Sequence, residues 1–194
     1  MSRVVQPAGM RGSLKWIQRA VNDRPDTLDA PLLAQLGGAT RIEWRSPLVA
    51  DDYAEYRDGD FLDRVLAGDL RADLAAFWPE RGPQWDALAR SDHGDILLVE
   101  AKAHVAEMLS PATQAGPASR VTISDTLDRV AADLAAEPKA AWTTSFYQLA
   151  NRLAHLWFMR RAGKPAWLVL ANFLGDTEMN CPSSAREWEA AYLV

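Results

Sequence analysis

The chain has 194 residues, of which 48% are hydrophobic and 24% are charged, and its formal net charge at pH 7 is −5. These values are typical of a globular protein with a sizeable core, and they exclude the overall basic field that favours nucleic-acid binding. The single cysteine, Cys181, excludes an intramolecular disulfide and favours a reducing, cytoplasmic location. The N-terminus carries no apolar signal-peptide core and no apolar run reaches membrane-spanning length, so we expect no membrane contact.

The first half of the chain is predicted to be mainly helical, because its apolar residues recur at helical spacing around one alternating stretch. We expect Glu55 to lie in the early turns of a helix that Asp51 or Asp52 caps. In chain order the predicted elements are a helix that starts at Ser13, a short helix that starts at Thr27 or Asp29 and ends before Gly37, a strand over residues 40–44, the helix from Asp51 or Asp52 to Leu66, and a helix over residues 70–78.

A β-hairpin is predicted over residues 84–104. Residues 96–99 form a β-rich apolar run, and the Ser-Asp-His-Gly sequence before them is typical of a turn. Because side chains alternate along a strand, Glu100, Lys102 and His104 point to the same face. Charges at the end of a buried strand are unusual, since a charge leaves water at a cost of several kcal/mol unless it is paired or bound to a metal. Pairing across the turn would bring Asp86, on the other arm, beside Glu100.

The second half of the chain is predicted to lead from this hairpin through helices to a second buried strand. Residues 110–119 are rich in Ser, Pro, Ala and Gly, and we interpret them either as a plain surface connection or as a mobile flap beyond Lys102. Gln148, Arg152 and His155 form a polar stripe along the longest helix. The predicted elements are a helix from Ser124, a helix over residues 143–161, a strand over residues 166–174, and a last helix that opens with a capping box of Ser184 and Glu187.

Asp86 followed by Glu100-Ala101-Lys102 resembles the motif of the PD-(D/E)XK nuclease superfamily, although Trp85 stands where the family usually has proline. The resemblance implies a restriction-endonuclease-like fold, a single α/β domain whose central mixed β-sheet contains the catalytic hairpin and is flanked by helices. The helical segment before residue 166 supplies the long crossover that a parallel strand pair needs. We therefore expect residues 1–48 to form a helical and strand extension that packs on a nuclease-like core, residues 49–194, as one structural unit.

One part of the predicted order departs from the family. The resemblance implies a strand between the helix that bears an acidic residue and the strand of the Asp, whereas the strand over residues 40–44 precedes that helix. Either residues 77–84 supply the missing strand, or residues 84–90 are bent into two pieces.

The resemblance implies a metal site on the hairpin. Asp86 and Glu100, with the backbone carbonyl of Ala101, would hold Mg²⁺, with Mn²⁺ as an alternative. Two carboxylates suit Mg²⁺, a hard cation that prefers oxygen ligands, and such a cation polarises a phosphoryl group during phosphodiester hydrolysis. Lys102 would orient the attacking water or stabilise charge on the phosphate.

Further residues are assigned to the edge of this site. Glu55 matches the position at which many members carry an additional acidic ligand, and Glu80 competes for this role. Gln148 is similar to the glutamine on the downstream helix of the exonuclease-like branch. Arg152 suits a phosphate contact because its donors form a planar fork, and His104 would touch the substrate.

Two functions follow from these residues. The first is a metal-dependent nuclease that acts on DNA in preference to RNA, with a homodimer left open. The second is a catalytically inactive protein of the same fold that serves as a binding module through some of its eight tryptophans. In the plainest interpretation, Glu100 and Lys102 are an ordinary pair at a strand end, and Glu55 is a solvated helix residue. The sequence carries no P-loop, no G-x-G-x-x-G and no G-x-S-x-G motif, and its three histidines form no zinc-type pattern.

Overall fold

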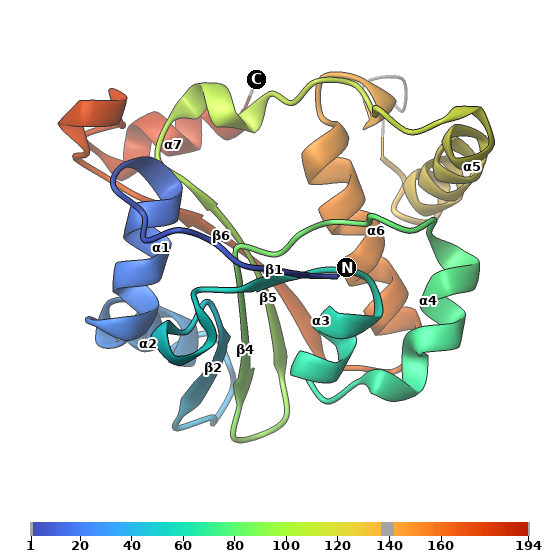
Figure 1. Ribbon diagram of the computed structural model, residues 1–194. Helices are drawn as coiled ribbons and strands as arrows, with labels where there is room; N and C mark the ends of the chain where they lie inside the picture. The colour runs from blue at the N-terminus through green and yellow to red at the C-terminus, as the bar shows by residue number, and fades with distance from the viewer. Residues whose placement is uncertain (1, 137–141, 194) are drawn as a thin grey trace.

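In the computed structural model, which describes residues 2–136 and 142–193, a four-stranded sheet runs through the middle of the helices (Figure 1). Short 3-10 turns, such as η3 (Val105–Met108), connect several elements. In chain order the strands and α-helices are β1 (Arg3–Val4), α1 (Gly12–Asn22), α2 (Asp26–Leu33), β2 (Ile42–Ser46), β3 (Glu55–Tyr56), α3 (Asp58–Arg64), α4 (Arg71–Phe77), β4 (Ala87–Ser91), β5 (Ile96–Lys102), α5 (Pro117–Asp133), α6 (Tyr147–Arg161), β6 (Ala166–Asn172) and α7 (Ala185–Tyr192).

The strands of this sheet lie in the order β2-β4-β5-β6. The pairs β2–β4 and β4–β5 are antiparallel, whereas β5 and β6 are parallel. A parallel pair needs a long crossover, and the chain between β5 and β6, which includes α5 and α6, supplies it. The predicted single α/β domain with a central mixed sheet is confirmed.

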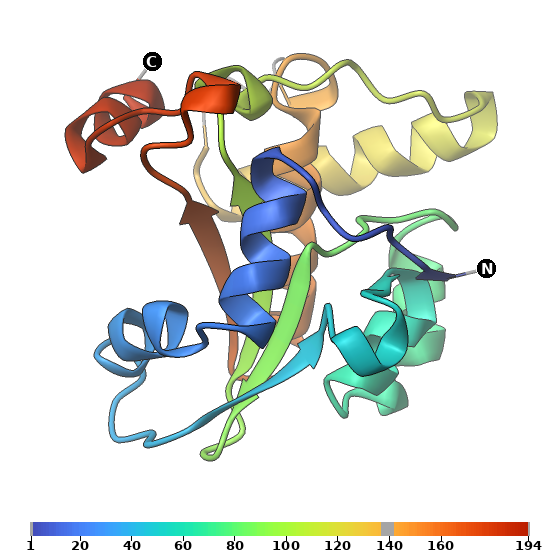
Figure 2. The ribbon, with the colours of Figure 1, turned by 60° about the vertical axis from the view of Figure 1, so that its left-hand side comes forward.

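Helices cover both faces of the sheet. Figure 2 shows α1 crossing one face, with α6 behind the sheet. On the α1 side, Ile17 and Val21 pack with Leu97 and Val99 of β5. On the other side, Leu98 packs with residues of α3, α4, α5 and α6. The side chains of β5 therefore alternate between two buried faces, as the sequence predicts.

The predicted hairpin is also confirmed. Arg90 pairs with Ile96 and Ala87 pairs with Val99, so the arms meet across the short turn that follows Ser91. The hydroxyl of Ser91 donates to Asp95 at 2.6 Å within this turn. Residues 77–84 form no strand, and the strand that pairs with β4 on its other side is β2, which comes earlier in the chain.

The prediction of one helix from Asp51 or Asp52 to Leu66 is wrong. Asp52 and Tyr53 have φ angles of 53° and 51°, which no α-helix accommodates. Glu55 then lies in the short strand β3, where it pairs with Val4 of β1, and helix α3 begins only after it. The loop over residues 110–119 is shorter than predicted, because α5 begins with Pro117 in its first turn rather than at Ser124.

Residues 1–48 contribute directly to the central layers. Strand β2 is a strand of the main sheet, and helix α1 packs on β5. Within the described residues, no helix combines the length and the apolar character needed to cross a membrane.

Candidate active site

The hairpin brings Asp86 beside Glu100. Ala87 pairs with Val99, so the next position outward places Asp86 opposite Glu100. One carboxylate oxygen of Asp86, Oδ2, accepts the backbone N–H of Ala101 at 2.7 Å. The carboxylate thus takes the place of a strand carbonyl at the end of the ladder, which fixes Asp86 against the Glu-x-Lys segment.

Glu100, Lys102 and Gln148 form a connected group at the end of β5. Glu100 is only 3% exposed and Lys102 only 8%. The Lys102 ammonium donates to Oε1 of Glu100 at 3.0 Å and to Oε1 of Gln148 at 2.8 Å. Gln148 lies in the first turn of α6, so the crossover helix delivers it to the hairpin. The structure therefore brings together Asp86, Glu100, Lys102 and Gln148.

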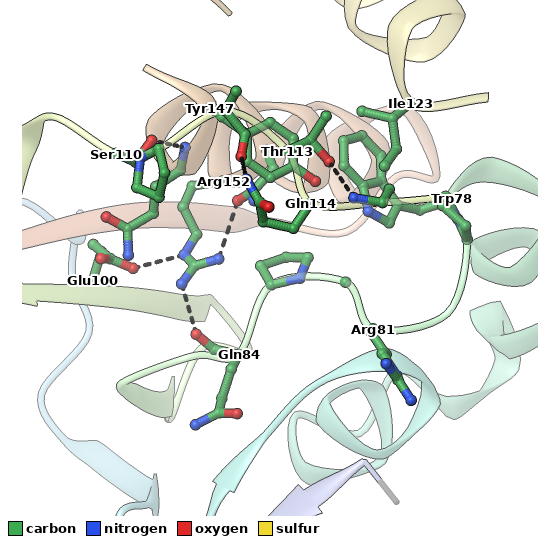
Figure 3. A pocket seen from close by; sticks show the side chains of 18 of the residues that line it. Trp78, Arg81, Gln84, Glu100, Ser110, Thr113, Gln114, Ile123, Tyr147 and Arg152 are labelled. Atoms are coloured by element: carbon green, nitrogen blue, oxygen red, sulfur yellow. Dashed lines mark hydrogen bonds and ion pairs between the residues drawn. The ribbon is translucent and has the colours of Figure 1, made fainter. Parts of the chain in front are cut away.

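Arg152 lies one turn further along α6 and binds the other oxygen of Glu100. Its Nε donates to Glu100 Oε2 at 2.7 Å, and its two terminal nitrogens donate to the carbonyl of Gln84 at 2.7 Å and to Oδ1 of Asn151 at 3.1 Å (Figure 3). The guanidinium also lies 4.9 Å from the ring centroid of Trp85. All three nitrogens are engaged within the protein, so the phosphate contact predicted for Arg152 would have to replace one of these bonds.

Glu55 reaches the same region from β3 rather than from a helix. The backbone N–H of Trp85 donates to the carbonyl of Tyr56 at 3.0 Å, which ties β3 to the residue before Asp86. The buried Glu55 carboxylate accepts hydrogen bonds from the side-chain amides of Gln6 and Gln84. Burial raises the pKa of Glu55, against the lowering effect of these two hydrogen bonds.

The carboxylates of this region carry more negative charge than its cations balance. Burial raises the pKa of Asp86 well above its ordinary value, and the neighbouring charges of Glu100 and Glu55 raise it further. Burial of Glu100 favours its neutral form, but the charges of Arg152 and Lys102 outweigh burial and lower the pKa of this carboxyl. If all three carboxylates ionise, one negative charge has no partner among these residues, so a proton or a bound cation is favoured at Asp86.

A pocket of about 950 Å³ opens above these residues. Its walls are residues 79–84 before β4, residues 109–116 after η3, and the first turns of α6. The second wall is tied to the chain before α6, since the N–H of Ser110 donates to the carbonyl of Ser145 at 2.8 Å and its hydroxyl accepts the N–H of Gln148 at 2.9 Å. The loop therefore lines the pocket, whereas a plain surface connection would not, and these bonds tie it to the start of α6.

Other predicted residues lie at or beyond the edge of the pocket. Glu80 is exposed and lines the pocket, whereas Glu55 does not line it. His104 does not line it either; its Nδ1 accepts the N–H of Ala106 at 2.9 Å and caps η3. Sequence reasoning missed Gln84, whose carbonyl binds Arg152 and whose amide binds Glu55. A single glutamine at the start of a predicted hairpin gives no signal of such a role.

The oxygen atoms at this site are of the type that a hard divalent cation prefers as ligands. Asp86 and Glu100 offer carboxylate oxygens, and one Asp86 oxygen is not used by Ala101. Both Glu100 oxygens, however, are in ion pairs with Lys102 and Arg152. Within residues 2–136 and 142–193, no three Asp, Glu, His or Cys side chains are already arranged to hold a metal ion.

Comparison of the chain with protein-family models, with curated proteins and with solved structures finds no match. The functional assignment therefore depends on the geometry of this site.

Proposed function

We propose that this protein is a metal-dependent phosphodiesterase of the PD-(D/E)XK type that hydrolyses nucleic acid, with DNA as the first substrate to test and RNA as the second. The observation that carries the proposal is the convergence of Asp86, Glu100, Lys102 and Gln148 on the floor of one pocket. Two side chains of this group come from the hairpin strand β5, one from the residue before β4, and one from the crossover helix.

The order of elements supports a restriction-endonuclease-like fold. Helix α1 is followed by the antiparallel strands β2, β4 and β5, then by the helical crossover and the parallel strand β6. The resemblance implies this order, with β2 between the first helix and the Asp strand. Helix α1 has no acidic residue, so the outer carboxylate of this chain would be Glu55 on β3.

The side chains have distinct roles in this proposal. Asp86, Glu100 and the carbonyl of Ala101 would hold a divalent cation, which would supply Lewis-acid polarisation of the phosphoryl group. The Lys102 ammonium has three donors and uses two of them on Glu100 and Gln148. No hydrogen bond to the described residues uses its third donor, which would orient a water or stabilise charge on the phosphate. Arg152 positions Glu100 rather than touching the substrate.

One observation favours a second function, a catalytically inactive binding module. Lys102 and Arg152 occupy both oxygens of Glu100, and a charge-paired carboxylate of this kind also occurs in purely structural ion pairs. In that case the pocket would bind a ligand without hydrolysing it.

Cleavage assays on single-stranded and double-stranded DNA and RNA, each with Mg²⁺ or Mn²⁺, separate the two functions. Asp86→Ala and Lys102→Ala are compared with Asp73→Ala and Lys164→Ala, which change the same residue types outside the pocket, at an exposed aspartate and at a half-buried lysine paired with Asp69. We expect metal-dependent cleavage that is lost in the first two variants and retained in the two controls, with all four proteins folded by circular dichroism. A folded parent that neither cleaves nor binds the metal in calorimetry would support the binding module instead.

A further inference from the structure

The pocket has two chemically different ends. Glu100 and Ser110 lie at one end in Figure 3, and Trp78 and Ile123 lie at the other, with Tyr147 between them. The Trp78 and Ile123 side chains are 4% and 3% exposed, so the apolar end is a preformed wall of the protein core. An apolar wall next to polar groups is the usual construction of a site for a small ligand.

The charges of the pocket are unsuited to a long polyanion. Its described lining includes four acidic side chains, Glu80, Asp86, Glu100 and Glu107, and three basic ones, Arg81, Lys102 and Arg152. Lys102 and Arg152 are both paired with Glu100. Arg81 is therefore the one basic lining residue in the described part of the chain that is outside an ion pair. Proteins that bind polynucleotides through the backbone neutralise several phosphates with Lys and Arg.

The size of the pocket also favours a small ligand over a long polymer. Its volume of about 950 Å³ lies within the range of roughly 300–1,000 Å³ that is usual for sites that bury a small molecule. The wall formed by residues 109–116 is hydrogen-bonded to the chain before α6, which limits access from that side. A pocket with these bounds accommodates a nucleotide unit more readily than a continuous duplex.

We infer that the pocket takes an unpaired nucleotide, with its base against the Trp78–Ile123 end and its phosphate beside Lys102, so that the substrates are short or frayed single strands rather than continuous duplexes. This inference rests on the proposed phosphodiesterase function and specifies its substrate class. Bases bind well to aromatic and apolar walls because every base has a π-face, whatever the sequence.

A bulky residue at the apolar end tests this inference. Ser119 and Ile123 lie one turn apart on α5 and both line the pocket, whereas the neighbouring residue Ala118 is exposed and does not. We expect Ser119→Trp to raise KM for a single-stranded tetranucleotide at least tenfold, and Ala118→Trp, the matched control, to leave it unchanged. An abasic tetramer lacks the base, so we expect Ser119→Trp to leave its KM unchanged.

Salt dependence provides a second measurement that needs no variant. Each single-strand phosphate neutralised by a cationic side chain contributes a slope of about −0.7 to the plot of log affinity against log salt concentration. With one unpaired cation, Arg81, in the described lining of the pocket, we expect a slope of about −0.7 for kcat/KM of the tetranucleotide, and poor cleavage of closed circular duplex DNA.

The outcomes separate this inference from the proposed function. Three results would overturn the inference: cleavage of a closed duplex as fast as of single strands, a salt slope of −4 or steeper, or equal effects of the two tryptophan variants. The proposed function would still stand if the observed cleavage depended on Asp86. Absence of Asp86-dependent cleavage of any of these substrates would overturn both.

Discussion

Replacing Arg152 with methionine removes the central ion pair of the site while keeping an unbranched side chain. Arg152 is 5% exposed and binds Glu100, the carbonyl of Gln84 and Asn151. Breaking a buried ion pair from one side typically costs about 3–5 kcal/mol, because the other charge is left without its partner. Lys102 remains bound to Glu100 in the variant, so we expect a loss near the lower end, about 3 kcal/mol in the free energy of unfolding at pH 7.

Urea unfolding followed by tryptophan fluorescence measures this loss, with the exposed Arg161→Met as the control, for which we expect less than about 0.5 kcal/mol. In a Glu100→Gln background Arg152 has already lost the carboxylate that it pairs with, so Arg152→Met leaves no carboxylate charge unpaired and its effect should fall to about 1 kcal/mol. If Arg152→Met lowers the free energy of unfolding by less than about 1 kcal/mol in the parent, or by the same amount in both backgrounds, the ion pair does not stabilise the site as argued.

Three further predictions concern other buried groups. We expect Lys102→Ala to reduce stability by only about 1–3 kcal/mol, because Arg152 still neutralises Glu100, and to abolish cleavage; loss of folding by circular dichroism would contradict this. The pKa of Asp86 is raised chiefly by burial, so its ionisation opposes folding as the pH rises above about 4. Asp86→Asn should therefore stabilise the protein at pH 7 and not at pH 4 in urea unfolding, and no difference between the two pH values would contradict the raised pKa. Burial lowers the pKa of His155 to about 3, so the folded protein should lose up to about 1.4 kcal/mol per pH unit below about 6.5. His155→Phe should remove this slope between pH 6.5 and 5, and an unchanged slope would show that His155 is not its source.

The hairpin and the positions of the candidate residues on it could be predicted because their signals are local. The apolar run before Glu100, the turn after Ser91 and the alternation of side chains all act within a short stretch of chain. The register that places Asp86 opposite Glu100 follows from the same stretch. Gln148 is a candidate only through the family resemblance, and the structure shows its side-chain oxygen accepting from the Lys102 ammonium at 2.8 Å.

The position of Glu55 could not be predicted because it depends on a distant segment. Strand β3 has two residues, and its antiparallel partner is β1 near the N-terminus. The left-handed backbone at Asp52 and Tyr53 that ends the preceding turn has no glycine to signal it. Apolar spacing therefore favoured one helix, whereas tertiary pairing produced a strand.

The partner of Arg152 was also beyond sequence reasoning. A polar residue on a helix faces either solvent or a buried charge according to how the helix packs. Here α6 packs on the sheet so that Arg152 meets Glu100. Only the three-dimensional arrangement distinguishes a free guanidinium from one that holds a carboxylate in place.

The parallel pairing of β5 and β6 also predicts an order in which the site assembles during folding. The β4–β5 hairpin joins neighbouring residues, whereas a long crossover separates Gln148 and Arg152 from it. Because closing a long loop costs conformational entropy, we expect the hairpin to form before these two residues reach it. Slow hydrogen exchange is therefore expected in the hairpin amides, and faster exchange in α6 if the helix opens as a separate cooperative unit. Each such opening would leave the Glu100 carboxylate without Arg152 and remove the α6 wall of the pocket, so the site is complete only while α6 is docked on the sheet.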